Sequence, residues 1–249
     1  MEKKYKLNVL EGKDIFDIIR NNRNLIDEYF WEYYENFTTK RLRTYVEDIC
    51  DFFNPSGNVL SIGCGHGLNE ILMSDMCQEV INIKGIDLVE FKIKSMNEII
   101  DLLGLENVVG IHADGMKMDF SDEFFDTIII IESLSHADNQ HQMLKEAARV
   151  LKKKGAVFVL DFNNGANPRI WIRSWKQRHF EETIENIVNP YFIRNRLLKM
   201  GFKDIVIEPY RHGRSFGHLR RMMLSKNMEL PSKLYLFVSK GFMLKGRKY

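Results

Sequence analysis

The sequence of 249 residues predicts an α/β fold: a doubly wound, seven-stranded, mostly parallel sheet with N-terminal helices and an inserted lid. Three observations lead to this fold class. From residue 58 onward, short apolar runs alternate with stretches whose apolar residues repeat at helical spacing. The run Phe125–Ile131 is apolar enough for a central strand that is buried on both faces. Residues 163–188, with Pro168 and two tryptophans, interrupt the alternation.

The N-terminal part is expected to be helical. Isoleucines at helical spacing, beginning at Ile15, predict one helix, and residues 39–53 predict a second. The Pro-Ser-Gly sequence after residue 54 ends this pattern. We therefore expect an N-terminal helical cap over residues 1–54 and a main domain over residues 55–249, with a substrate-side insert at about 163–188.

Within the main domain, strands and helices are expected to alternate. The expected strands are 59–62, 80–86, 107–112, 125–131, 156–160, 203–208 and 234–239. Gly104 is expected to end the helix after the second strand, and Asn189-Pro190 to begin the helix before the sixth. Lys152–Lys154 suit the negative C-terminal end of the helix before the fifth strand, and Gly155 is expected to stop it.

The charge is unevenly distributed, although the formal net charge is only +2. Residues 163–249 hold 18 Lys and Arg and 6 Asp and Glu, whereas residues 1–162 hold 18 and 28. Such asymmetry indicates an anionic partner for the C-terminal part. A basic solvated surface beside an acidic one explains it equally well.

Cysteine usage and the N-terminal residues favour a cytoplasmic protein. The three cysteines, Cys50, Cys64 and Cys77, lack metal-ligand spacing, and their odd number argues against a disulfide framework. No apolar run is long enough for a membrane span, and the charged N-terminal residues lack the apolar block of a signal peptide.

A glycine-rich loop, Gly63-Cys64-Gly65-His66-Gly67, follows the first strand and precedes a helix. Glycines permit close approach to a ligand, and the helix start favours a carboxylate or phosphate. Asp87, at the end of the second strand, has the position of a carboxylate that binds a ribose diol. Leu68 stands where a dinucleotide fingerprint requires its third glycine, although NAD remains the alternative ligand. A tight turn beside a spare aspartate is the structural alternative.

The loop resembles the first motif of class I S-adenosylmethionine-dependent methyltransferases, in particular the type 11-like small-molecule and sugar O-methyltransferases. The resemblance covers about residues 55–162. It also rests on His112-Ala113-Asp114, Phe125-Asp126, Glu132-Ser133-Leu134-Ser135-His136 and Arg149-Val150-Leu151-Lys152. One departure is Ser61, where many members carry an acidic residue near the end of the first strand.

The resemblance implies S-adenosylmethionine as cofactor and no metal. Asp87 would then bind the ribose, Asp114 would lie near the adenine, and the glycine loop would approach the amino-acid end. The implied cofactor-binding residues are Gly63, Cys64, Gly65, His66, Gly67, Asp87, Leu88, Ala113, Asp114, Gly115 and Glu132. A solvated loop histidine is the alternative for His66, and a small filler is the expected role of Cys64.

Methyl transfer to an alcohol needs a base, because the alcohol proton is weakly acidic. His136 follows the fourth strand and Asp161 ends the fifth, so both are expected at the carboxyl edge of the sheet. The resemblance implies that they form a base dyad, in which the carboxylate orients the imidazole. Alternatively, His136 is a helix-entry residue that packs on the cofactor or orients the acceptor.

The acceptor is expected to lie between the N-terminal aromatic cluster and the insert. Tyr33 or Tyr34 would close over the methyl donor, and Trp171 and Trp175 would wall a cavity, although aromatics at such spacing are also common in cores. Arg173 belongs to a basic segment suited to phosphate or carboxylate.

These residues predict an enzyme that methylates a small molecule, most readily a hydroxyl of a sugar or an anionic metabolite. The alternatives are an N-methyltransferase of an amine or phosphobase, and a non-catalytic regulatory protein that binds S-adenosylmethionine. Nucleic acid is not favoured as a partner, because the fourth strand lacks the Asn/Asp-Pro-Pro-aromatic motif of base-amino methyltransferases. Contact of the Trp/Arg segment with a membrane surface, and a homodimer, remain open.

Overall fold

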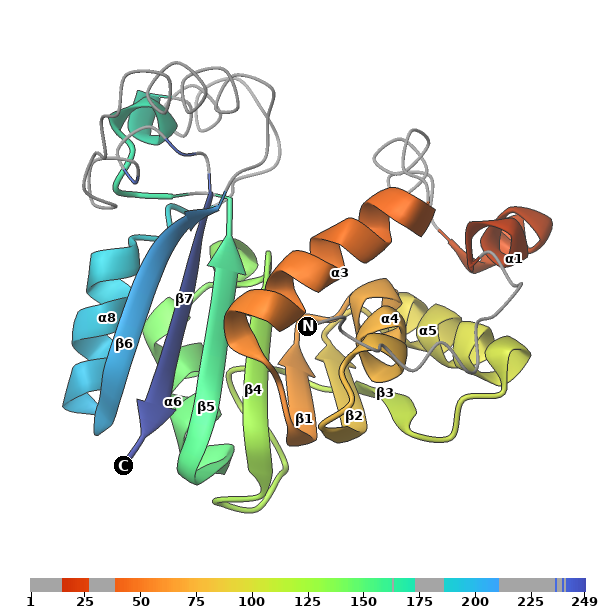
Figure 1. Ribbon diagram of the computed structural model, residues 1–249, viewed down its shortest axis with the longest axis horizontal. Helices are drawn as coiled ribbons and strands as arrows, with labels where there is room; N and C mark the ends of the chain where they lie inside the picture. Colours follow the sequence, from red (N-terminus) through yellow and green to blue (C-terminus); the bar gives the residue numbers. More distant parts are fainter. Residues whose placement is uncertain are drawn as a thin grey trace, which may run out of the picture.

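The protein folds around one seven-stranded mixed sheet (Figure 1). The computed structural model describes residues 15–26, 39–162, 164–172, 186–210, 236, 239 and 241–249. The strand order is β3-β2-β1-β4-β5-β7-β6, in which the first five are parallel and β7 runs antiparallel to both β5 and β6. The predicted doubly wound, mostly parallel sheet is therefore confirmed.

The strands have the following bounds: β1 Gly57–Ile62, β2 Val80–Asp87, β3 Val108–His112, β4 Phe125–Ile131, β5 Leu151–Asp161, β6 Phe202–Tyr210 and β7 Gly241–Lys248. The α-helices are α1 Ile15–Asn21, α3 Thr39–Phe53, α4 Leu68–Met76, α5 Glu90–Leu103, α6 Gln140–Val150 and α8 Pro190–Lys199. Two 3-10 turns, η1 Arg23–Leu25 and η2 Leu134–His136, complete the described elements. None of the helices in the described part of the chain is long and apolar enough to cross a bilayer.

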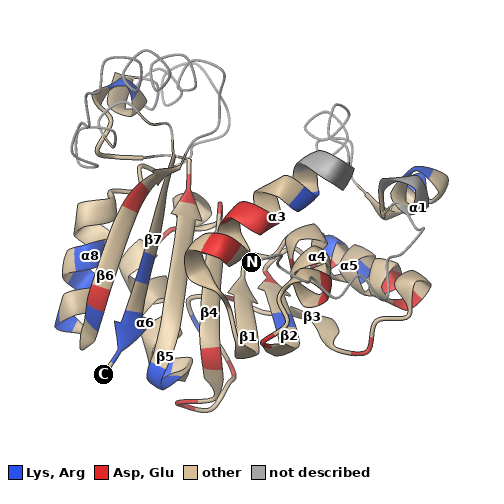
Figure 2. Cartoon of the chain, viewed as in Figure 1, with Lys and Arg blue, Asp and Glu red and all other residues tan. Residues whose placement is uncertain are grey.

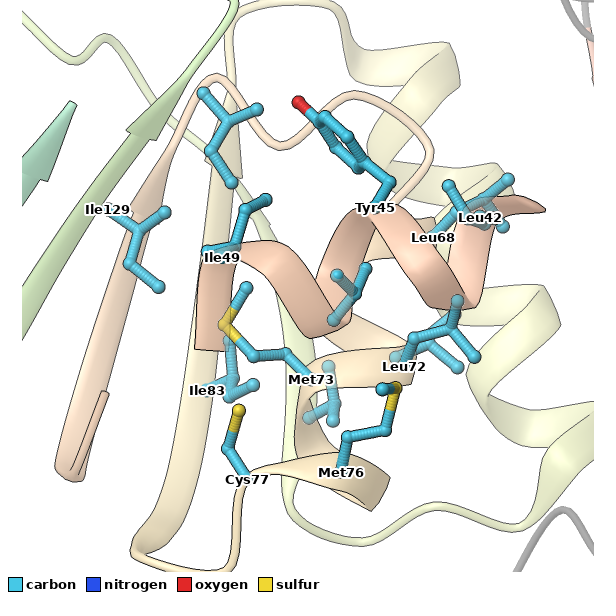
Figure 3. Packing of buried hydrophobic residues seen from close by; sticks show 14 of the residues in the cluster. Leu42, Tyr45, Ile49, Leu68, Leu72, Met73, Met76, Cys77, Ile83 and Ile129 are labelled. Carbon is cyan, nitrogen blue, oxygen red and sulfur yellow. The ribbon is translucent and has the colours of Figure 1, made fainter. Parts of the chain in front are cut away.

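Helices cover both faces of the sheet and give two buried apolar clusters. On one face, α3, α4 and α5 pack against β1 and β2, and Figure 3 shows Ile49 of α3 and Met73 of α4 close to Ile83 of β2. On the other face, α6 packs against β5 and α8 packs against β6 and β7, and residues such as Leu144 and Ile193 are buried there. The strands of the sheet are thus packed against helices on both faces, and this packing fixes the position of their carboxyl ends.

Two predicted helix boundaries are confirmed in atomic detail. Gly104 ends α5 in the left-handed conformation, with φ of +68°. Asn189 caps α8, because its side chain accepts hydrogen bonds from the backbone N–H groups of Tyr191 and Phe192.

The sequence assigned two strands incorrectly. The last strand described is β7, residues 241–248, whereas the predicted strand 234–239 lies mostly outside the described residues and its Leu236 is helical. The apolar run of β7 has three residues and lies among glycines and basic residues, which hid the strand pattern. The lysines at 152–154 and Gly155 belong to β5 and do not end α6, which stops at Val150. An irregular register between Phe125 and Thr127 lengthens β5, and Lys152 pairs with Asp126 at 2.8 Å.

The expectation of no disulfide is also wrong, because Cys50 and Cys77 are bonded. Cys50 lies near the end of α3 and Cys77 follows α4 directly, 27 positions later in the sequence. Helix α3 packs across α4, and this packing brings together two cysteines whose sequence spacing carries no sign of pairing. Cys64 is free.

Charged residues are unevenly distributed over the described elements (Figure 2). Acidic residues lie in the C-terminal half of α3, whereas basic residues gather on α8 and at the end of β7. The described residues therefore preserve the charge asymmetry of the sequence, and they do not identify its partner.

Candidate functional site

The glycine loop connects β1 to α4 at the carboxyl edge of the sheet. Gly63, Gly65 and Gly67 all have positive φ, at +74°, +57° and +73°. The N–H groups of Gly63 and Cys64 both donate to the carbonyl oxygen of Ile86, at 2.7 and 3.0 Å. The loop is therefore fastened to β2 through its backbone.

The three glycines serve different purposes. A Cβ at Gly63 would collide with the Cβ of Ser133, and one at Gly67 would collide with the side chain of Met96. A Cβ at Gly65 would meet nothing within 4 Å. Gly63 and Gly67 are thus required by packing, whereas Gly65 borders open space.

Asp87 holds the open part of the loop in place. Its Oδ2 accepts the N–H of Gly65 at 2.9 Å, and its Oδ1 accepts the N–H of Val89 at 2.9 Å. Each oxygen keeps a lone pair, so the carboxylate can still accept hydrogen bonds from the two hydroxyls of a ribose diol. Leu88, which is 65% exposed, lies between these two contacts.

The segment after β3 lies along the same edge. The N–H of Ala113 donates to the carbonyl oxygen of Asp87 at 3.1 Å, and Asp114 Oδ1 accepts the N–H of Met116 at 2.8 Å. A Cβ at Gly115 would approach the side chain of Ile62 to 2.6 Å. The contacts therefore join the predicted adenine-side residues to the strand that carries Asp87.

His66 and Cys64, the two side chains between the glycines, are turned inward. His66 is buried, and its Nδ1 lies 2.9 Å from the Oγ of Ser95, which contradicts the alternative of a solvated loop histidine. Burial raises the pKa of the Cys64 thiol well above its ordinary value, and the charges of Glu70 and Asp87 add to this shift. Cys64 is therefore a thiol that fills space beside Met96 and not a reactive thiolate.

Glu70, a buried carboxyl group in the first turn of α4 after the glycine loop, was not predicted from the sequence. Ser61 Oγ donates a hydrogen bond of 2.6 Å to Glu70 Oε1, and burial raises the pKa of Glu70 to about 7. Ser61 is the position at which many class I methyltransferases carry an acid, so this chain supplies the carboxyl group from α4 instead. A charged residue between Leu68 and Ile71 of a buried helix was the available signal.

The residues after β4 lie beside the glycine loop. Ser133 Oγ donates to the carbonyl oxygen of Ile62 at 2.7 Å. Glu132 has a positive φ of +52°, and its carboxylate accepts the hydroxyl of Tyr45 on α3 at 2.9 Å. This segment therefore bridges the cofactor loop and α3.

The predicted base and its partner lie on adjacent elements. Asp161 is 1% exposed, and its Oδ2 accepts the N–H of Ser135 at 3.1 Å. His136, the last residue of η2, is exposed, and its N–H donates to the carbonyl oxygen of Ser133 at 3.1 Å. The contact between the two elements is made to the backbone next to His136, so the pairing of imidazole and carboxylate stays a prediction.

The described residues cover little of the predicted acceptor side. Trp171 is 54% exposed, and its Nε1 donates to the carbonyl oxygen of Gly165 at 2.9 Å. The other predicted residues, Tyr33, Tyr34, Arg173 and Trp175, lie outside the described residues.

A family model described as a methyltransferase domain matches residues 30–207. The chain is 31% identical over 120 residues to a demethylmenaquinone methyltransferase of Listeria welshimeri. This match covers 48% of this chain and 49% of that protein. It is 30% identical over 105 residues to a 27-O-demethylrifamycin SV methyltransferase of Amycolatopsis mediterranei. This match covers 42% of this chain and 38% of that protein. The chain thus spans half or less of the length of these curated relatives.

Among solved structures, a SAM-dependent methyltransferase from Archaeoglobus fulgidus matches with a TM-score of 0.63 at 19% identity. The match covers 89% of this chain and 100% of that one. This likeness shows a shared fold.

Proposed function

Because the chain belongs to the methyltransferase domain family, we propose that it transfers a methyl group to a hydroxyl of a sugar or anionic metabolite, with His136 as general base. Its cofactor is S-adenosylmethionine, which supplies an activated methyl group. The described residues fit this cofactor, since Gly65 borders open space and the Asp87 carboxylate beside it keeps acceptor capacity. Binding is therefore assigned to the glycine loop, Asp87 and the residues after β3.

The observation that carries the proposed base is the position of η2. Ser133, just before this turn, contacts the glycine loop, while Ser135 within it is held by Asp161. His136 is the exposed residue of the turn, at the carboxyl edge of the sheet. An imidazole at this edge would accept the proton of a hydroxyl that attacks the methyl group, a role that typically contributes ~10²–10⁴-fold to the rate.

Two further features support the proposed acceptor class. The relative from Amycolatopsis mediterranei is named for a 27-O-demethyl compound. Residues 163–249, with 18 Lys and Arg against 6 Asp and Glu, suit an acceptor with negative charge.

An N-directed reaction is the second candidate, and Glu132 favours it. Its partly buried carboxylate, next to Ser133, supplies negative charge close to the glycine loop. Such a group attracts an amine, and His136 would then orient the acceptor without removing a proton.

The test is the turnover of His136→Ala with a panel of sugars, anionic metabolites and amines, measured as S-adenosylhomocysteine formation. We expect a loss of ~10²–10⁴-fold with hydroxyl acceptors and an unchanged dissociation constant for S-adenosylmethionine. Asp138→Ala, an exposed change in the same loop, is the matched control and should keep full turnover. Equal turnover of His136→Ala and wild type would contradict the base, and activity confined to amines would favour the N-directed reaction.

A further inference from the structure

Glu70 is a buried carboxyl group with one oxygen bonded and one oxygen unsatisfied. Its side chain accepts the hydroxyl of Ser61 through Oε1, at 2.6 Å. Its Oε2 is buried and has no hydrogen-bond partner among the described residues. The residue as a whole is 2% exposed. A buried carboxyl group in this state is costly, which suggests a function that compensates for the cost.

The position of Glu70 ties it to the cofactor loop. It lies in the first turn of α4, and Ser61 lies one residue before the end of β1, so the Ser61–Glu70 hydrogen bond joins the two elements that the glycine loop connects. The charges of Glu70 and Asp87 both raise the pKa of Cys64, within the loop. Glu70 is therefore close enough to act electrostatically on a ligand bound above Gly65.

The surroundings of Glu70 bring its titration close to neutral pH. Burial raises the pKa of Glu70 to about 7, and the charge of Asp87 on β2 adds to this shift, against the opposing hydrogen bond from Ser61.

Other charged or titratable groups on the elements around α4 have contacts of their own. On α3, Arg43 pairs with Asp75 of α4 at 3.6 Å, and Tyr45 donates to Glu132 of the β4 end. His66 of the glycine loop contacts Ser95 of α5, and the charge of Lys92 on α5 lowers the pKa of Cys64.

We propose that Glu70 is a positioning residue that couples the charge of the cofactor to a proton. Ionised Glu70 favours S-adenosylmethionine, whose sulfur is a cationic sulfonium, and protonated Glu70 favours S-adenosylhomocysteine, whose sulfur is neutral. Loss of the methyl group would leave a neutral thioether, because the electron pair of the broken S–C bond stays on sulfur, and Glu70 would then take up a proton from solvent. The proton of a hydroxyl acceptor is a separate one, which leaves through the base.

The proposal rests on the cofactor and not on the identity of the acceptor. Two unit charges about 10 Å apart at an effective dielectric constant of about 20 change an equilibrium roughly tenfold. The preference for S-adenosylmethionine over S-adenosylhomocysteine should therefore rise about tenfold between roughly pH 6 and pH 8.5.

Isothermal titration calorimetry with the two compounds on the full chain tests this. At pH 7, in buffers of different ionisation enthalpy, S-adenosylmethionine should release a fraction of a proton on binding, and S-adenosylhomocysteine should not. Equal proton counts for the two compounds would overturn the proposal, and this measurement needs no variant. Absence of binding by both compounds would overturn the cofactor assignment as well, which makes the two failures distinguishable.

Three variants locate the effect. Glu70→Gln keeps an oxygen for the Ser61 hydroxyl and should abolish both the pH dependence of the preference and the difference in proton release. Ser61→Ala removes a hydrogen bond that lowers the pKa of Glu70, so the midpoint of the preference should move to higher pH. Glu79→Gln, at an exposed site just after α4, should behave as wild type. A pH dependence that survives in Glu70→Gln would overturn the proposal.

Discussion

The two halves of the functional edge are built in different ways. On the cofactor half, from β1 to β3, the side-chain contacts join residues of the same or neighbouring β-α units: Asp87 binds Val89 two residues away and Gly65 22 residues away, and His66 reaches Ser95 across 29. On the acceptor half, at the end of β4, Ser133 reaches Ile62 across 71 residues and Tyr45 reaches Glu132 across 87. The first half, called local below, is held by contacts between neighbouring segments, whereas the second also requires β1 and α3 to be assembled against β4.

This difference predicts that the two halves respond differently to mutation. Damage to the local half should change ligand binding and leave the fold largely intact. Mutation of the acceptor half, called the assembled half below, should also lower the free energy of unfolding, because each contact there joins elements that are distant in sequence.

The largest effect is expected where the two halves meet, at Gly63. An alanine there combines a positive φ with a collision against Ser133, and we expect a loss of about 3–4 kcal/mol in the free energy of unfolding. Gly65→Ala shares the positive φ and meets no atom, so it should cost only about 1 kcal/mol while it weakens binding of S-adenosylmethionine. Denaturant titration measures the stability of both variants, and calorimetry measures their affinity for S-adenosylmethionine. Equal loss of stability in the two would contradict the view that Gly63 is required by packing and Gly65 by the ligand.

The disulfide is the next largest expected effect, because it joins α3 to the loop after α4. A bond that closes 27 residues should contribute about 3 kcal/mol, which Cys50→Ser would lose under oxidising conditions. Cys64→Ser, which removes the free thiol and keeps the disulfide, is the control and should depend on reductant as wild type does, whereas Cys50→Ser should not. Thermal melts with and without dithiothreitol provide the test, and a wild type indifferent to dithiothreitol would speak against a stabilising bond.

Glu70 gives an expected pH effect on stability. Its pKa is raised from 4.5 to about 7, so the folded protein holds this proton more tightly than the unfolded chain. Wild type should therefore lose stability as the pH rises through this window, by at most about 3 kcal/mol. Glu70→Gln should match wild type near pH 4 and exceed it at pH 8, as followed by urea titration at each pH. A constant difference between the two proteins at all pH values would contradict the shifted pKa.

The sequence predicted the local half well, because its signals lie within single segments. The glycine loop and Asp87 were identified from their spacing, and their contacts agree with it. Glu70 was missed because its importance depends on Ser61, which belongs to another element. The disulfide was missed for the same reason, since only the crossing of α3 over α4 brings Cys50 to Cys77.

The parallel strands of the sheet were predicted better from the sequence than the antiparallel strand β7 at its C-terminal end. Parallel strands such as β4 are continuous apolar runs, which a single sequence reveals. Strand β7 is antiparallel and carries three basic residues after its apolar part, so its pattern is weak and its position depends on pairing with β5 and β6. Pairing between strands is a tertiary property that local pattern does not contain.

The smallest expected effect tests the assembled half at its most remote contact. Tyr45→Phe removes the hydroxyl that Glu132 accepts and keeps the ring that packs edge-on against Tyr210 at 5.8 Å. We expect a loss of about 1 kcal/mol in stability, typical of one hydrogen bond. If the contact also orients the segment that leads to His136, turnover should fall while the affinity for S-adenosylmethionine stays constant. A change in cofactor affinity with unchanged turnover would place Tyr45 with the local half and would break the division between the two.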